Sequence, residues 1–356
     1  MREASSLMTN RAAAGAVAET IFGRRQFLFF GGALHSRGPE PAAGNWLSFS
    51  RLAMACRFEV VTSPQDECGV LAAQECLDEV DRIESVLSIF RPASEATLLN
   101  CAAMRPVQVS PQLYALLQFC QRLHHETEGA FDIATGALSK CWGFQERQPR
   151  VPSPELLSSA RECSGFHLLS LRPDCCVVPR SPGVRVDFGA VGKGYALDRG
   201  ALKMRARGIG TALLSAGHSS VLALGAGPGG AGWLVGLRHP VWKGQRLGIV
   251  RLRSCAMGTS GQEEQWFEAD GQRYGHILDP RTGFPPHDVL SVTVIADSAA
   301  RADALATAFF VGGPDLARRY CAHHDGVIAV MLLERDLFHP LVIGSNDQAA
   351  VEIIYA

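Results

Sequence analysis

Residues 184–195 read VRVDFGAVGKGY, and this stretch decides how the rest of the chain is interpreted. Up to Phe188, apolar side chains alternate with polar ones, which is typical of a half-buried strand. Gly189, Gly192 and Gly194 follow closely, and glycine allows the backbone to turn sharply and to approach other groups. A helix is expected from about Tyr195. The stretch therefore predicts a strand that passes through a glycine-rich turn into a helix.

Helix and strand patterns continue on both sides of this turn. Apolar residues at helical spacing and capping residues predict helices from about Val70 to Leu87, from the Ser110 N-cap to Gly129, and from Asp297 or Ser298 to about Phe310. Further strands are expected at residues 58–62, 211–214, 221–224 and 290–295. The mixture predicts the α+β class, as one domain with a mixed β-sheet and flanking helices.

The composition is that of an ordinary soluble globular protein. The 356 residues are 47% hydrophobic and carry a formal net charge of −1, so the chain lacks the basic character of a nucleic-acid-binding protein. The eleven cysteines include no C-x-x-C pair, so neither a zinc ribbon nor a disulfide framework is expected. Buried thiols that act as small hydrophobic side chains are the expectation.

Residues 1–46 are predicted to be a leader and linker before a domain at residues 47–356. Arg24 and Arg25 precede a short apolar run, a combination that resembles a twin-arginine export signal. The run is too short to span a bilayer, so no stable membrane span is expected. Export would place the protein in the periplasm or cell envelope. The alternative is an N-terminal extension with a chance arginine pair on a cytoplasmic protein.

Asp303 and Thr307 form the sharpest local pattern. They lie four residues apart on an expected helix, so their side-chain oxygens project from one face. A carboxylate and a hydroxyl are hard ligands that suit Mg²⁺ or Ca²⁺ better than zinc. The alternative is an acid near a helix N-terminus and a threonine bonded back to the helix, and the pattern alone favours this alternative.

Lys193 lies in the glycine-rich turn, where a helix N-terminus and a positive charge would both favour an anion. The turn is neither a Walker A loop nor a dinucleotide-binding fingerprint, because the glycine spacing differs and no Ser or Thr follows the lysine. Taken alone, it predicts a phosphate or nucleotide site and a tight structural turn equally well.

Two further segments carry chemistry-bearing residues. His276 stands shortly before Asp279-Pro280, and histidine can act as a general base because its unperturbed pKa lies near neutrality. The alternative is a histidine that satisfies a hydrogen bond of the turn. Residues 129–132 read GAFD, and their simplest interpretation is the start of a strand after a helix end.

In this order and spacing, the segments resemble the FAD:protein FMN transferase (ApbE) family. The resemblance covers roughly residues 48–313. The matching segments are residues 129–132, 187–196, 259–261, 276–283 and 302–307, with Phe90-Arg91-Pro92 and Ser94-Glu95 upstream. Five segments in register make a chance similarity improbable.

The resemblance implies a single ApbE-like domain that is an enzyme. Such an enzyme holds FAD with Mg²⁺, transfers FMN to a threonine or serine hydroxyl of a target flavoprotein, and releases AMP. Asp303 and Thr307 would be side-chain metal ligands, the Ala190 carbonyl a third ligand, and His276 the catalytic base. The residues implied for the FAD site are Met54, Phe90, Ala130, Phe131, Asp132, Asp187, Lys193 and Ile277.

Two segments depart from the family pattern. Met54-Ala55-Cys56 stands where Met-Gly-Thr is usual, and residues 215–219, SAGHS, stand where an Asn and a Gly-Gly pair are usual. The first change affects the expected adenine or ribose contact, and the second leaves His218 without an assigned role. Neither change touches the implied base or side-chain metal ligands.

Two other functions would use the same pocket. One is a flavin-binding protein without transfer activity, and the other is a metal-dependent FAD pyrophosphatase that uses water in place of the acceptor hydroxyl. The presence of His276, Asp303 and Thr307 favours an enzyme over a passive binder. The sequence does not separate the transferase from the pyrophosphatase.

Overall fold

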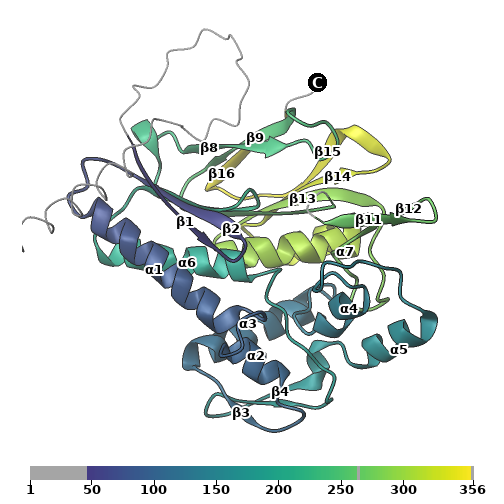
Figure 1. Ribbon diagram of the computed structural model, residues 1–356. Helices are drawn as coiled ribbons and strands as arrows, with labels where there is room; N and C mark the ends of the chain where they lie inside the picture. Colours follow the sequence, from purple (N-terminus) through teal and green to yellow (C-terminus); the bar gives the residue numbers. More distant parts are fainter. Residues whose placement is uncertain (1–45, 263–264, 354–356) are drawn as a thin grey trace, which may run out of the picture. The chain divides into compact units, whose positions relative to one another are not determined.

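An eight-stranded sheet is the largest element of the fold (Figure 1). The structure is a computed structural model that describes residues 46–262 and 265–353. Within these residues every pairing of the sheet is antiparallel. Its strands, in spatial order, are β1 (Leu47–Ala53), β2 (Cys56–Thr62), β6 (Ala212–Ala216), β7 (Ser220–Leu224), β10 (Ala256–Gly261), β13 (Val289–Ala296), β14 (Ile328–Leu333) and β15 (Asp336–Gly344).

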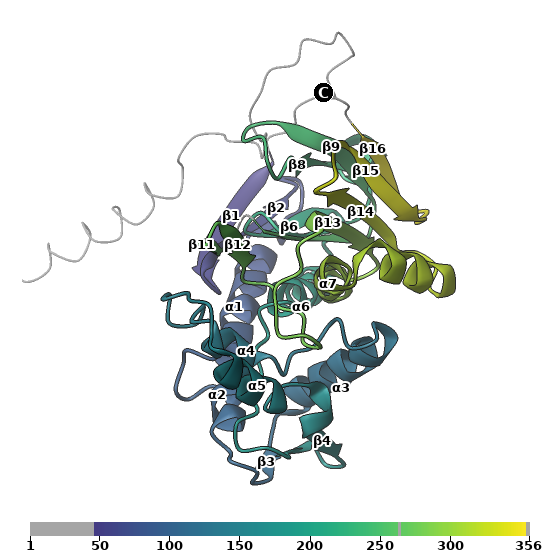
Figure 2. The ribbon, with the colours of Figure 1, turned by 90° about the vertical axis from the view of Figure 1, so that its right-hand side faces the viewer.

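Further layers cover the two faces of this sheet. On one face, Val221 and Val330 pack with Trp233 and Val250 of a three-stranded sheet. That sheet contains β8 (Trp233–Arg238), β9 (Arg246–Leu252) and β16 (Ala349–Ile353). On the other face lie the helices α1 (Gly69–Leu87), α6 (Gly192–Ala206) and α7 (Ala299–His323) (Figures 1 and 2). Hydrophobic cores therefore fill both sides of the large sheet.

The remaining elements are the helices α2 (Glu95–Asn100), α3 (Pro111–Glu126), α4 (Gly136–Cys141) and α5 (Pro154–Glu162), the 3₁₀ turns η1 (Phe166–Leu168) and η2 (Pro228–Gly230), a small sheet of β3 (Val107–Gln108), β4 (Leu169–Arg172) and β5 (Cys176–Pro179), and a hairpin of β11 (Trp266–Ala269) and β12 (Gln272–Gly275). Of these, α2–α5 and the small sheet lie on the side of the helices α1, α6 and α7 away from the large sheet, whereas the β11–β12 hairpin lies beside β13 (Figure 1).

The first two predicted helices are confirmed, and local sequence explains them. In α3, the Ser110 side chain accepts a hydrogen bond from Leu113 N at 3.2 Å, and Pro111 occupies the first turn. Shortly after the helix, Gly129 takes a φ of +76°, as expected of a glycine that follows a helix end. The apolar stripe predicted for α1 is buried at Cys76, Val80, Ile83 and Leu87.

The predicted start of α7 is confirmed, and α7 consists of two helical segments joined at a kink. Its N-cap is Ser298, whose side chain accepts from Arg301 N at 3.4 Å. The sequence pattern places its end near Phe310, but the helix continues through a break at Gly313, where φ is +70° and ψ is −172°, and at Pro314. The predicted end therefore lies just before this break, where Gly313 leaves the helical φ/ψ region and Pro314 begins the second segment.

Residues 184–188 do not form the predicted strand, although their apolar side chains alternate toward the core. The Asn100 side chain accepts from Val186 N at 2.6 Å and donates to Val186 O at 2.9 Å. Asp187 N donates to Ile133 O at 2.7 Å. A side chain and a loop thus satisfy the backbone groups that a neighbouring strand would otherwise satisfy.

The predicted α+β class is confirmed, with an antiparallel large sheet where a mixed one was expected. The predicted leader and linker lie outside the described residues except for Trp46. In the part of the chain that the structure describes, no helix is long and apolar enough to cross a membrane.

Candidate active site

The site begins where α6, α7, β7 and β10 approach one another closely. A Cβ added to Gly258 in β10 would lie 2.6 Å from Asp303 N. A Cβ added to Gly194 in α6 would lie 2.1 Å from Ala299 O. The two glycines therefore permit a strand and two helix starts to meet at the Asp303 side chain.

The Asp303 carboxylate is buried among hydrogen-bond donors. Its Oδ2 accepts from Gly194 N at 2.7 Å, and the Ser220 hydroxyl donates to both carboxylate oxygens at 2.8 and 2.9 Å. Burial raises the pKa of Asp303 to about 7, although the charge of Lys193 and these hydrogen bonds act in the opposite direction. The protein thus compensates this negative charge incompletely, and a nearby cation would stabilise it.

Thr307 lies one turn along α7 from Asp303. Its Oγ1 donates to Asp303 O at 3.3 Å and lies 3.1 Å from Ser260 Oγ of β10. The helix bond considered as an alternative interpretation is therefore present, beside a second hydroxyl. Among the described residues, no group of three His, Cys, Asp or Glu side chains could hold a metal. One carboxylate with hydroxyl and carbonyl oxygens fits a hard ion that retains water and binds substrate phosphate, as Mg²⁺ does.

Lys193 and the glycine-rich turn stand beside this carboxylate. Lys193 Nζ donates to Ser219 Oγ at 2.5 Å, and Ser219 O accepts from Thr259 N at 2.8 Å. Ser219 belongs to the segment that departs from the family pattern, and its hydroxyl accepts the hydrogen bond of this lysine. In the turn itself, the Asp187 carboxylate accepts from Gly189 N at 2.9 Å, and Ala190 follows half-buried before α6 begins.

Residues 129–132 form a tightly held loop next to that turn. The carboxylate of Asp132 accepts from Ala134 N at 2.7 Å and from Phe166 N at 2.8 Å, and His124 Nδ1 lies 3.0 Å from it. Burial lowers the pKa of His124, but the hydrogen bond and charge of Asp132 outweigh it, and the net pKa is raised. Ala130 and Phe131 are each 1% exposed, so their side chains fill the interior under the loop.

His276 follows β12 directly and is half-buried. Its N and its Nδ1 both lie near Gln265 O, at 3.1 and 3.2 Å. A carbonyl oxygen can only accept, so this contact requires the proton to be on Nδ1. The next residue, Ile277, packs against the main hydrophobic core.

Met54 and Phe90 lie on the α1 side of the fold. Met54, with a φ of +48°, is in the β1–β2 turn, and its N donates to Glu84 Oε1 at 2.7 Å. Glu84 also accepts from the Arg91 side chain, while the neighbouring Phe90 is 74% exposed. Glu84 therefore links the two segments, a role that no sequence pattern had indicated.

Direct contacts thus join Asp303 and Thr307, and the charge of Lys193 acts on the Asp303 carboxylate. Asp187 N joins the glycine-rich turn to the end of the loop at residues 129–132 by donating to Ile133 O. The sequence interpretation missed Ser220, which binds both Asp303 oxygens. Ser220 is the one polar residue of β7, and this pattern could have indicated that its side chain has a hydrogen-bond partner in the interior.

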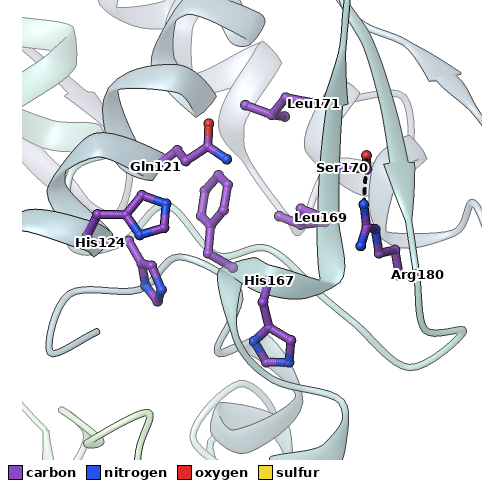
Figure 3. Close-up of a pocket in the computed structure, with 9 residues that line it drawn as sticks. Gln121, His124, His167, Leu169, Ser170, Leu171 and Arg180 are labelled. Atoms are coloured by element: carbon purple, nitrogen blue, oxygen red, sulfur yellow. Dashed lines mark hydrogen bonds between the residues drawn. The ribbon is translucent and has the colours of Figure 1, made fainter. Parts of the chain in front are cut away.

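A separate cavity of about 270 Å³ is lined mainly by residues of α3, η1 and β4 (Figure 3). His124 lines it and also contacts Asp132, but no residue predicted for the site lines it. Its walls are Gln121, His124, His125, Phe166, His167, Leu169, Ser170, Leu171 and Arg180.

Comparison with known proteins places this geometry in a family. The model of the ApbE family matches residues 54–332. The FAD:protein FMN transferase of Treponema pallidum (strain Nichols) is 36% identical, covering 78% of this chain and 81% of its own length. That of Escherichia coli (strain K12) is 31% identical over 73% of this chain and 76% of its own length.

Solved structures agree with the sequence comparison. The crystal structure of the ApbE protein from Thermotoga maritima has a TM-score of 0.76 and 30% identity, and the match covers 85% of this chain and 97% of that chain. The sequence match and the shared fold both extend over most of the chain, and this protein therefore belongs to the ApbE family.

Proposed function

We propose that this chain transfers the FMN half of FAD to a threonine or serine hydroxyl of a target flavoprotein, with Mg²⁺, and releases AMP. FAD:protein FMN transferase is the name of the curated relatives described above, and membership of their family makes this chain an enzyme of that class. The observation that most supports the finer proposal is the buried Asp303 carboxylate beside Lys193 and the start of α6.

The residues around Asp303 suit a bound diphosphate. Mg²⁺ held by Asp303, Thr307 and the Ala190 carbonyl would neutralise charge on the FAD diphosphate. Lys193 and the N–H groups at the start of α6 would bind its oxygens, since a helix N-terminus favours anions. The glycines of the turn permit the backbone to approach the phosphates closely.

The proposed chemical step is a displacement at phosphorus. His276 takes the proton of the acceptor hydroxyl through Nε2, because Gln265 O holds the proton on Nδ1. The acceptor oxygen bonds to the FMN phosphorus while the bond from that phosphorus to the bridging oxygen breaks. AMP leaves with the bridging oxygen.

The loop at residues 129–132 would shape the flavin side of the pocket. Its Asp132 carboxylate is engaged within the protein, so we assign it the support of the loop that contacts FAD. Asp187 would support the adjoining turn in the same way. Met54, Phe90 and Ile277 complete the proposed FAD site.

Intact-protein mass spectrometry of a candidate acceptor domain, with an assay for AMP, tests the proposal. With FAD and Mg²⁺, we expect the acceptor to gain the mass of FMN less one water, and to lose this gain without metal. His276→Ala should retain FAD affinity, while the transfer rate falls by about 10²- to 10⁴-fold.

Other outcomes would select the rival functions. AMP and free FMN without a mass gain on any acceptor would indicate a pyrophosphatase. FAD that stays bound and intact would indicate a flavin-binding protein. Loss of FAD binding in His276→Ala would show that His276 has a structural role.

A further inference from the structure

The loop that carries His276 is bounded by two structured ends. We call residues 276–282 the base loop. The β11–β12 hairpin precedes it, and Gly283 follows it. The hydrogen bonds of His276 N and Nδ1 to Gln265 O tie the imidazole to the hairpin, and the ring of Phe144 lies edge-on to it at a centroid distance of 6.5 Å.

The β11–β12 hairpin depends on packing against other elements to keep its position. In the described part of the chain, it forms a two-stranded sheet by itself, and such a hairpin is only marginally stable in water. Phe267 and Tyr274 lie opposite each other on its two strands and stack with ring centroids 5.4 Å apart. Both rings face Trp142, at centroid distances of 6.3 and 5.3 Å. The hairpin is thus held by aromatic packing on Trp142 and on Phe144, whose ring centroid lies 6.0 Å from that of Phe267.

Trp142 also binds the far end of the base loop. Its Nε1 donates to Gly283 O at 2.9 Å, and its ring meets that of Phe284 edge-on at 5.8 Å. Trp142 is 0% exposed and follows directly after α4, so the surrounding core fixes the position of its side chain. One side chain therefore contacts both Tyr274 before the loop and Gly283 after it.

We propose that Trp142 is a positioning residue that clamps both ends of the base loop and keeps His276 in the Nδ1–H tautomer, with Nε2 as the basic nitrogen. This inference rests on the proposed role of His276 as the base. Trp142 acts through Tyr274, Gln265 O and Gly283 O. Its removal should change the chemical step and leave FAD affinity unchanged.

Nitrogen-15 NMR of histidine-labelled protein without substrate tests the clamp directly. His276→Gln identifies the His276 signals by their loss. We expect the Nδ1–H tautomer in the wild type and a mixture of both tautomers in Trp142→Leu. Trp142→Phe keeps a ring against Tyr274 but loses the bond to Gly283, so it should show a smaller fraction of the second tautomer.

A second pair of variants avoids the deep core, because Tyr274 is only half-buried. Tyr274→Ala removes the ring that packs on Trp142. Tyr274→Phe keeps the ring and loses only the hydroxyl that donates to Gln272 Oε1 at 3.1 Å. Tyr274→Ala should mix the tautomers and lower kcat for transfer by about 10- to 100-fold with KM for FAD unchanged. Tyr274→Phe should match the wild type in its His276 tautomer and in its kcat for transfer.

Trp233→Phe is the matched control. Trp233 is also buried, and its Nε1 donates to a backbone carbonyl, Leu224 O at 3.2 Å, in the core between the two larger sheets. This variant loses the same kind of bond, so it should lower thermal stability while the His276 tautomer and kcat stay unchanged.

A single Nδ1–H tautomer together with wild-type kcat in Tyr274→Ala would overturn the proposal. So would a tautomer change of equal size in Trp233→Phe, because it would reflect general destabilisation. If the wild type transfers no FMN, the proposed function fails, and the tautomer comparison still decides whether Trp142 holds the base loop.

Discussion

Asp303 is buried and yet proposed to act as an anion, so stability and function oppose each other at this residue. Above its raised pKa of about 7, the folded protein must hold an ionised carboxylate out of water, which costs free energy that the unfolded chain does not bear. For Asp303→Asn at pH 8 without added metal, we expect an unfolding temperature equal to or above that of the wild type, with FMN transfer abolished.

Thermal unfolding and the acceptor mass assay measure these two effects. Ser220→Ala is the control, because it leaves the Asp303 carboxylate but removes the hydroxyl that donates to both of its oxygens. That variant should unfold at a lower temperature. If Asp303→Asn unfolds several degrees below the wild type, the carboxylate contributes net stability and the proposed opposition is wrong.

The residues of this cluster were predictable to different degrees. Asp303 and Thr307 could be paired from sequence, because residues four apart on a helix share a face. Ser220 could not be paired with Asp303 from sequence, because the two residues are 83 positions apart along the chain. Glu84, 30 positions from Met54, was missed for the same reason. Contacts set by the packing of distant elements leave no spacing in the sequence.

Asp198 couples two helices. It lies on α6, and its two carboxylate oxygens accept from Ala299 N and Ala300 N at the start of α7, at 2.8 and 2.9 Å. Burial raises the pKa of Asp198 to about 6, which outweighs the lowering effect of these two bonds. Ionisation is therefore harder in the folded protein than in the unfolded chain, where an aspartate has a pKa of about 3.9.

The sign of the pH effect follows from this raised pKa. Between about pH 4 and pH 6 the folded state binds more protons at Asp198 than the unfolded state, so its contribution to stability falls as pH rises. We expect the free energy of unfolding of the wild type, relative to Asp198→Asn, to fall by up to roughly 3 kcal/mol across this range. Urea unfolding of both proteins at several pH values measures it, and a difference that rises with pH would contradict the assignment.

Local patterns predicted the helices and the strands β2, β6, β7 and β13, but were wrong at residues 184–188. The buried faces of α1 and α3 could be predicted because their apolar residues recur every three or four positions along the sequence. Residues 184–188 carry a strand pattern, yet Asn100 replaces the neighbouring strand. The β11–β12 hairpin had an unused signal: Asp270 and Gly271, with φ of +51° and +75°, form the Asp-Gly turn that hairpins favour.

At the scale of the whole molecule, the resemblance predicted more than the periodicity did. The alternation of helices and strands sufficed for the α+β class, but strand order is a long-range property. Phe58 of β2 pairs with Ala216 of β6, and Val292 of β13 pairs with Met331 of β14. The order of the family's segments carries this information indirectly, because the solved ApbE structure compared above shares this fold.

The first residues of the chain lead to a prediction about the protein's location. We propose that Arg24 and Arg25 direct the folded protein to the cell envelope. In a bacterium with twin-arginine translocation, replacing both with lysine should retain the protein in the cytoplasm, as measured by cell fractionation. Equal periplasmic amounts of both forms, or export in a strain that lacks this translocation system, would refute the proposal.

The close approach at Gly258 and Gly194 has a consequence for how this family can evolve. A mutational scan should find that Gly258→Ala abolishes transfer and folds poorly, because its methyl group would meet the backbone of α7. Gly210→Ala, where a Cβ meets nothing within 4 Å, should be tolerated. The backbone of α7 thus already occupies the place of a Cβ at Gly258, so any change of the chemistry around the Asp303 carboxylate has to come from other side chains.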